Sequence, residues 1–186
     1  MILPIYGYGN TVLREKAKDI SPDYPGIKEL IADMFETMYE AEGVGLAAPQ
    51  IGKAIRLFVI DAAPMVEDDK ELKGFKKVFI NAHITEEDGE PWLHNEGCLS
   101  LPGVREDVRR KPKVKMKYLD ENFTPHEEVF EGMKARIFQH EYDHLDGILI
   151  PDRISQIRRA LIRNKLNNIV IGNVSVDYKM KFVKKK

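Results

Sequence analysis

Hydrophobic residues recur with helical spacing in the first quarter of the chain. Between about Gly26 and Glu42 they follow an i, i+3, i+4 pattern, which places them on one face of a helix. The apolar positions are Ile27, Leu30, Ile31, Met34, Phe35 and Met38. We therefore predict an amphipathic helix here, preceded by a shorter helix that starts after Asn10 and Thr11.

A second helical stripe carries histidines where core side chains are expected. Met133, Ile137, His140 and His144 follow the i, i+4, i+7, i+11 spacing of one helix face. Gly147 is a typical helix stop, and the proline four residues later prevents continuation. Two imidazoles on a core-facing stripe cost free energy unless a partner satisfies them, and a metal ion is such a partner.

Strands are predicted between and after these helices, from runs rich in β-branched and aromatic residues. These runs span 55–61, 78–86, 91–95, 114–119 and 127–131. A basic helix over about 152–167 and a last alternating strand over 174–182 complete the order. It predicts an α+β fold of small, mainly antiparallel β-sheets packed around a central metal-binding helix, with a C-terminal helix and a terminal strand.

Composition and charge narrow the class of protein. The 186 residues, 43% of them hydrophobic, suffice for a single domain over 1–186 with one main core. Within it, 64–76 is expected to be an exposed insertion and 152–186 a basic helix and tail. A net charge of -1 gives no indication of a broad nucleic-acid-binding surface. One cysteine and the lack of a secretory or membrane-spanning segment predict a cytoplasmic protein without a membrane partner, and we expect a monomer.

The candidate chemistry lies in the segment HEYDH at 140–144. His140 and His144 are one helical turn apart, so both rings can bind one ion. Glu141 follows the first histidine directly, and its carboxylate can reach a water at an open position of the metal. The alternative is a chance H-E-x-x-H match on a solvated helix, because the pattern fixes only three residues.

A catalytic site of this kind needs a third protein ligand. No glutamate follows Glu141, and no histidine or cysteine follows His144, which leaves only Asp146, Asp152 and Asp177 downstream. The first two resemble surface residues beside a turn. The third ligand is therefore expected upstream, which disfavours the ordinary peptidase arrangement.

Upstream, the candidates are His83, His94, Cys98 and His126. The three histidines lie in polar strand-like or loop segments and are interpreted as structural. Cys98 lies between a glycine and a Ser-Leu-Pro-Gly turn, which indicates irregular backbone near a site. Its alternative role is that of a small buried apolar residue, as for most free cysteines.

A glycine-containing segment, GVGLAA at 43–48, also fits a loose dinucleotide-binding fingerprint. Such a site needs a strand before the glycines and a helix after them. Here a predicted helix precedes them and a strand-like run follows, so nucleotide binding is disfavoured. The glycines then serve backbone geometry alone or a different site.

Three segments together resemble the signature motifs of peptide deformylases, the bacterial-type polypeptide deformylase family. They are GVGLAAPQ at 43–50, EGCLS at 96–100 and QHEYDH at 139–144. Their order and spacing match, and the similarity extends to about residue 155. It implies a single catalytic domain that removes the formyl group from N-formylmethionyl peptides.

The resemblance also implies roles for individual residues. Cys98, His140 and His144 would hold one divalent metal, and Glu141 would be the general base and acid. The oxyanion would be stabilised by Gln50 and the backbone N–H of Leu99. Fe²⁺ is the physiological metal that the resemblance suggests, and Zn²⁺, Ni²⁺ or Co²⁺ also suit one sulfur and two nitrogens.

Four further residues would contact the substrate by the same resemblance. The backbone of Gly45 would pair with the peptide, and Arg105 matches the position of a substrate-contacting arginine. Val44 and Arg136 would line the cleft for the methionine side chain. Many relatives have an aliphatic residue at position 136, so we expect the arginine stem to cover a pocket wall while its guanidinium reaches water.

Two alternative functions and one partner remain to be weighed. An HExxH metallopeptidase would cleave internal peptide bonds, and a non-catalytic metal-binding module would have a fourth protein ligand. From Arg153 to Lys186 the chain carries ten Lys or Arg against one acidic residue. This segment is either a solvated helix face with a frayed end or a docking element for ribosomal RNA.

Overall fold

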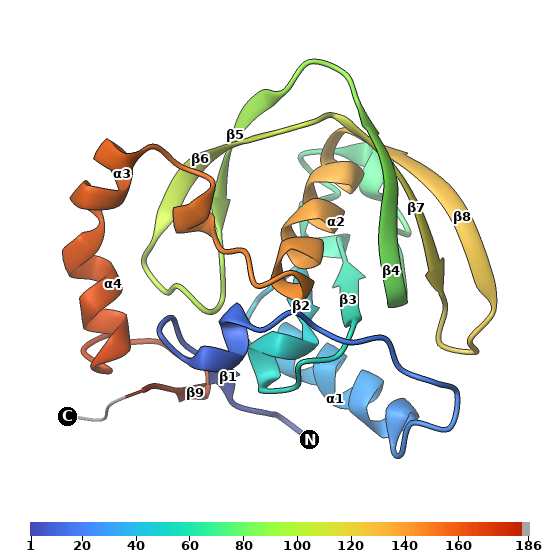
Figure 1. Cartoon of the computed structure of the whole chain (residues 1–186), viewed down its shortest axis with the longest axis horizontal. Helices are drawn as coiled ribbons and strands as arrows, with labels where there is room; N and C mark the ends of the chain where they lie inside the picture. Colours follow the sequence, from blue (N-terminus) through green and yellow to red (C-terminus); the bar gives the residue numbers. More distant parts are fainter. Residues whose placement is uncertain (184–186) are drawn as a thin grey trace.

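The computed structural model describes residues 1–183, and the last three residues of the predicted basic tail lie outside them. Its largest sheet is antiparallel, with the strand order β2-β3-β4-β7-β8. The strands are β2 (Gly45–Ala47), β3 (Leu57–Asp61), β4 (Lys76–Asp88), β7 (Lys113–Leu119) and β8 (Pro125–Glu131). The fold is α+β, as predicted, with helix α2 (Gly132–Leu145) at its centre (Figure 1).

Strand β3 explains how the sheet is covered on both faces. Successive strand residues point to opposite sides, and all four from Leu57 to Ile60 are fully buried. Phe58 and Ile60 pack with α2, whereas Leu57 and Val59 pack with α1 (Ile27–Glu40). The apolar interior therefore has two large parts, one on either side of the sheet, where the sequence predicted one main core.

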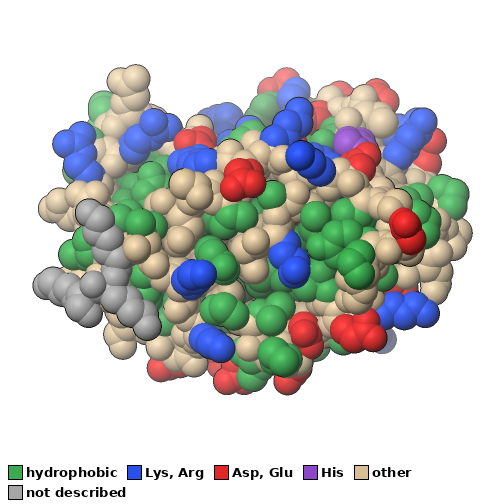
Figure 2. All heavy atoms as spheres, turned by 60° about the horizontal axis from the view of Figure 1, so that its bottom comes forward, with side chains coloured by type: hydrophobic (Ala, Val, Ile, Leu, Met, Phe, Trp, Pro, Cys, Tyr) green, Lys and Arg blue, Asp and Glu red, His purple; other side chains and the backbone are tan. Residues whose placement is uncertain are grey.

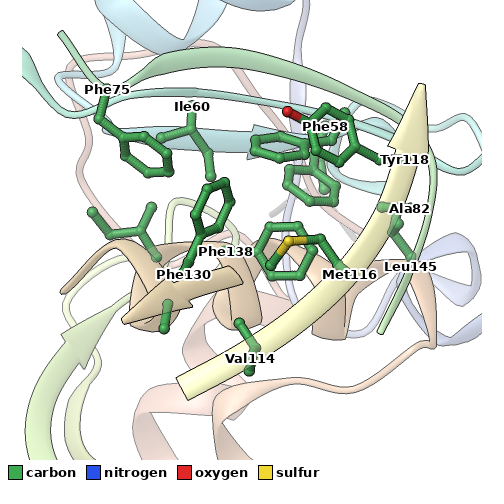
Figure 3. Packing of buried hydrophobic residues seen from close by; sticks show 14 of the residues in the cluster. Phe58, Ile60, Phe75, Ala82, Val114, Met116, Tyr118, Phe130, Phe138 and Leu145 are labelled. Carbon is green, nitrogen blue, oxygen red and sulfur yellow. The ribbon is translucent and has the colours of Figure 1, made fainter. Parts of the chain in front are cut away.

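Aromatic rings fix α2 against the sheet (Figure 3). The ring of Phe138 meets the rings of Phe58 and Phe79 edge to face, with centroids 5.3 and 5.2 Å apart. Phe130 and Phe75 make a similar contact at 5.2 Å. Fully buried rings of this size contribute strongly to core stability. They hold the helix that carries both histidines in a set position.

A separate hairpin brings the cysteine segment to α2. It consists of β5 (Trp92–Gly97) and β6 (Arg105–Arg110), and Cys98 directly follows β5. In Figure 1 the hairpin and the strands β4, β7 and β8 lie on opposite sides of α2. The sequence did not predict β6, because its buried side of Glu106, Val108 and Arg110 is mostly charged.

The C-terminal region differs from its prediction. In place of one helix over 152–167, the chain forms α3 (Gln156–Leu161) and α4 (Arg163–Val170). The predicted strand over 174–182 is reduced to β9 (Met180–Lys181), which pairs in parallel with β1 (Ile5–Tyr6). Alternating side chains there are half-buried, but the strand that pairs with this backbone among the described residues, β1, is two residues long.

Short 3₁₀ helices complete the described chain. They are η1 (Thr11–Arg14), η2 (Ala48–Ile51), η3 (Ala63–Met65), η4 (Lys70–Leu72) and η5 (Ile150–Asp152). Most side chains of 64–76 are exposed, but Leu72 and Phe75 are buried and attach the segment to the core beside α2. Among the described residues, every helix is too short or too polar to cross a bilayer.

Candidate metal centre and active site

Cys98, His140 and His144 meet at one point of the fold. One potential ligand atom from each lies within 4.8 Å of the others, and Cys98 Sγ is 3.4 Å from His144 Nε2. The histidines are one turn apart on α2, with ring centroids 5.3 Å apart. The upstream cysteine thus lies beside both histidines, whereas His83 and His126 pair with Asp19 and Asp120 elsewhere.

The arrangement fits a divalent metal ion. Tetrahedral coordination with ordinary zinc–ligand distances separates a sulfur and a nitrogen by about 3.6 Å, close to the observed 3.4 Å. His140 donates from Nδ1 to Glu96 at 3.1 Å, which leaves Nε2 to bind an ion. Such an orienting carboxylate is typical of histidine ligands. Among the described residues, no further Asp, Glu, His or Cys joins this group, so the donor set stops at three.

Three ionisable groups of the site have shifted pKa values because they share one buried space. Burial and the neighbouring His140 lower the pKa of His144 well below its ordinary value. Burial also acts to lower the pKa of His140, but hydrogen bonds with Cys98 and Glu96 outweigh it and raise that pKa. Burial raises the pKa of Glu141 to about 7. A cation bound in this space would therefore affect the protonation of all three groups.

Glu141 approaches the backbone of β2 at Gly45. The carboxylate is 4% exposed, and its Oε2 has no hydrogen-bond partner in the described structure. A Cβ atom at position 45 would lie 2.4 Å from Oε1 of Glu141 and 2.7 Å from its Cδ. Side chains do not approach that closely, so glycine is required for Glu141 to occupy this place.

Substituting Gly45→Ala is therefore expected to displace Glu141 without removing a ligand. A shift of about 1 Å in a catalytic group typically costs on the order of 100-fold in rate, and we expect a loss of that size in kcat/KM. Metal content, measured by elemental analysis, should stay at the wild-type value.

The matched control is Gly74→Ala, where an added Cβ meets no atom within 4 Å. Gly74 has φ +73, so this variant should lose some stability but keep its activity. Equal kinetics for the Gly45→Ala variant and the wild type would show that the position of Glu141 does not matter.

Gln50 and Leu99 lie at the edge of the same site. Gln50 is buried in η2; its Oε1 accepts from the Ala47 N–H at 2.9 Å. Its Nε2 lies 3.6 Å from Cys98 Sγ and 3.2 Å from Ser100 Oγ. The carbonyl of Leu99 accepts from the Tyr178 hydroxyl at 2.8 Å. The loop after Cys98 is therefore held by partners from segments that precede and follow it in the chain.

A cleft of about 740 Å³ opens onto these groups. Its walls include all four residues expected to contact substrate, together with five of the expected metal-binding or catalytic residues. These are Val44, Gly45, Arg105, Arg136, Gln50, Cys98, Leu99, His140 and Glu141. His94 and the C-terminal residues Ser175 to Tyr178 also line it. The sequence offered His94 and Asp177 only as candidate ligands, and neither joins the ligand group. On the face shown in Figure 2, acidic and basic side chains are interspersed.

The two arginines differ in their surroundings. Arg105 is exposed, and Asn95 accepts from its Nε at 2.8 Å. Arg136 is 2% exposed, and its guanidinium does not reach water as expected. The β5–β6 hairpin covers it, and its Cζ lies 4.2 Å from the centre of the Trp92 ring. The helical pattern alone could not reveal this cover.

A buried charge network, not predicted from the sequence, lies behind the histidines. Glu96 binds Arg110 through both carboxylate oxygens at 2.7 and 2.9 Å, and Arg110 reaches Asp143 at 2.8 Å. Burial acts to raise the pKa of Glu96, but hydrogen bonds from His140 and Arg110 outweigh it and hold that pKa well below its usual range. Acidic residues flanking Cys98 and His144 in the motifs were the available signal.

Comparison with known proteins agrees with this geometry. The family model described as polypeptide deformylase matches residues 2–160. A peptide deformylase of Flavobacterium johnsoniae is 56% identical over 189 residues, which cover 98% of this chain and 96% of the relative. One of Cytophaga hutchinsonii is 47% identical over the full length of both chains.

Solved structures give the same result. The peptide deformylase of Thermus thermophilus has 43% identity and a TM-score of 0.79, covering 90% of this chain and 97% of that one. Arabidopsis thaliana peptide deformylase 1B, solved with an inhibitor, has 34% identity and a TM-score of 0.80 over 90% of each chain. The chain belongs to the polypeptide deformylase family of hydrolases.

Proposed function

We propose that this protein is a metal-dependent amidase that removes the N-formyl group from formyl-methionyl N-termini of newly made polypeptides. The observation that supports it most is the place of Glu141. Its buried, unpartnered carboxylate lies beside one sulfur and two imidazole ligands, at a cleft open to a peptide.

Cys98, His140 and His144 would hold the ion. When bound, a divalent metal supplies Lewis acidity towards the formyl oxygen and lowers the pKa of water. Fe²⁺ is proposed as the physiological metal, and Zn²⁺, Ni²⁺ and Co²⁺ as replacements, because borderline metals accept this mixed donor set.

The residues around the ion would transfer the protons and stabilise the negative charge that develops on the substrate. Glu141 takes a proton from the attacking water and later gives it to the leaving amine. While the water attacks, and before the amine leaves, negative charge grows on the formyl oxygen. The Nε2 amide of Gln50 and the N–H of Leu99 donate to that oxygen, and one such donor typically contributes about 10²–10³ in rate.

Substrate binding is proposed to use the cleft walls. The backbone of Gly45, in an extended strand, pairs with the peptide main chain, and the exposed Arg105 contacts the substrate beyond the formyl group. Val44 and the stem of Arg136 line the space for the methionine side chain. The protein would act as a monomer in the cytoplasm.

The decisive assay compares substrates for the metal-loaded enzyme. Formyl-Met dipeptides should be hydrolysed, whereas acetyl-Met dipeptides and longer peptides with free N-termini should be inert. Cleavage of internal bonds would favour a metallopeptidase. Metal binding without hydrolysis of any of the three would favour a non-catalytic module.

A transient contact between the basic C-terminal segment and ribosomal RNA is also proposed. At least two of its cations already have acidic partners, since Arg158 pairs with Glu106 and Arg153 with Asp143. Arg163 and Lys165 are exposed on α4 without an acidic partner among the described residues. They are among the side chains of the described segment that are available for phosphate, as are Lys179 and Lys181.

Replacing Arg163 and Lys165 with glutamine should weaken ribosome binding and make it less dependent on salt. The slope of log affinity against log salt should fall by roughly 0.7 for each phosphate that is no longer neutralised. Sedimentation with ribosomes measures this, and Lys113→Gln and Lys115→Gln on β7 serve as the charge-matched control. An unchanged salt slope would reject the contact.

A further inference from the structure

Arg136 is a buried cation of α2 that lies against the β5–β6 hairpin rather than in solvent. It precedes His140 on α2 by one turn, at i and i+4, and is 2% exposed. A buried arginine is costly unless its donors are satisfied, and here Nη1 and Nη2 have acceptors whereas Nε has none in the described structure. Its partners therefore indicate what the residue does in the fold.

The guanidinium of Arg136 joins α2 to both strands of the β5–β6 hairpin. Nη2 donates to the carbonyl of Trp92 on β5 at 2.7 Å, and Nη1 donates to the carbonyl of Val108 on β6 at 3.0 Å. Nη1 also donates to Oε1 of Glu96 at 2.6 Å. A planar fork with several donors can make these contacts together, which a lysine cannot.

Glu96 connects Arg136 to the metal site. Its other oxygen, Oε2, accepts from His140 Nδ1 at 3.1 Å. Cys98, which provides the sulfur, follows Glu96 by two residues and comes directly after the end of β5. Arg136 thus contacts the segment that supplies the thiol. Through Glu96 it also influences the orientation of the His140 imidazole.

We propose that Arg136 is a positioning residue that sets the spacing between the Cys98 sulfur and the histidine pair. It links the hairpin to α2 near His140, while Arg110 links the hairpin to Asp143 further along the helix. This inference rests on the proposed function, because it assumes that the three ligands hold an ion.

The test is the affinity for Co²⁺, measured by chelator competition on the full chain. Arg136→Met keeps the stem but removes all three donations, and we expect affinity to fall about 10–100-fold, the usual cost of losing an orienting partner. The absorption bands of bound Co²⁺ should shift because its ligand geometry changes. Arg136→Lys keeps a charge near Glu96 but not both carbonyl contacts, and should show an intermediate loss.

Arg56→Met is the matched control. Arg56 is also buried, donates to the Ala82 carbonyl and to Asp146, and has its Cζ 5.1 Å from the centre of the Tyr142 ring. It has no contact with Glu96 among the described residues. This variant should lose stability but keep the wild-type Co²⁺ affinity and spectrum.

The outcomes separate a positioning role from a structural or substrate role. Wild-type Co²⁺ affinity and spectrum in Arg136→Met, even with a raised KM, would overturn the proposal. Equal affinity losses in the Arg56→Met and Arg136→Met variants would also overturn it, since both would then reflect general destabilisation. If Arg136→Met does not fold, a wild-type affinity in Arg136→Lys decides against the proposal. Failure of the proposed function would appear instead as absent formyl hydrolysis in a wild type that binds Co²⁺.

Discussion

Replacing Glu141 with glutamine is expected to lower kcat by about 10²–10⁴, the usual contribution of a general base and acid. Glutamine has nearly the same shape and can occupy the space against Gly45, but its amide cannot accept a proton from water. Cys98, His140 and His144 are unchanged, so the variant should still bind one metal per chain.

The measurement is formate release from a formyl-Met dipeptide together with metal content. Glu106→Gln is the matched control, because Glu106 is also buried, at 4% exposure, but pairs with Arg158 outside the cleft. It should keep wild-type kcat while losing some stability. A Glu141→Gln enzyme with full metal and near wild-type kcat would remove the carboxylate from the mechanism.

The second large effect is expected from Cys98→Ser. A neutral hydroxyl is a much poorer ligand than a thiolate for borderline metals. Loss of an orienting partner alone costs about 10–100-fold in affinity, so loss of a ligand should cost more than about 100-fold. Activity should fall with metal content and return only in part when excess metal is added.

Equilibrium dialysis against a chelator measures that affinity. His83→Asn is the control, since His83 is exposed and pairs with Asp19 away from the site. Its affinity should equal that of the wild type. If Cys98→Ser binds metal as tightly as the His83→Asn control, the sulfur is not a ligand.

The sequence predicted the elements whose pattern is local. Helices α1 and α2 follow from regular apolar spacing, and the longer strands follow from runs of β-branched residues. Strand β1 could not be predicted and the strand expected over 174–182 is reduced to β9, because each is two residues long and pairs with a partner about 175 positions away. Strand β6 was missed because ion pairs, which depend on the folded state, replace apolar residues on its buried side.

The candidate site, too, could be predicted only where its residues form a local sequence pattern. The chemistry of HEYDH indicated two ligands and a base, and the resemblance to a family, more than chemistry, selected Cys98 among four upstream candidates. The partners of His140 and Arg136 come from the hairpin and could not be read from helical spacing. This is why the guanidinium of Arg136 was expected in water but is buried against Trp92 and Glu96.

The central claim is that one thiolate and two imidazoles hold a single ion and leave a position for water. X-ray absorption at the iron edge, on protein loaded with Fe²⁺ without oxygen, tests it most directly. We predict one sulfur neighbour and a small set of nitrogen and oxygen neighbours that includes both imidazoles, with the sulfur absent in Cys98→Ser. A wild-type spectrum without sulfur, or with only protein ligands around the iron, would contradict the account.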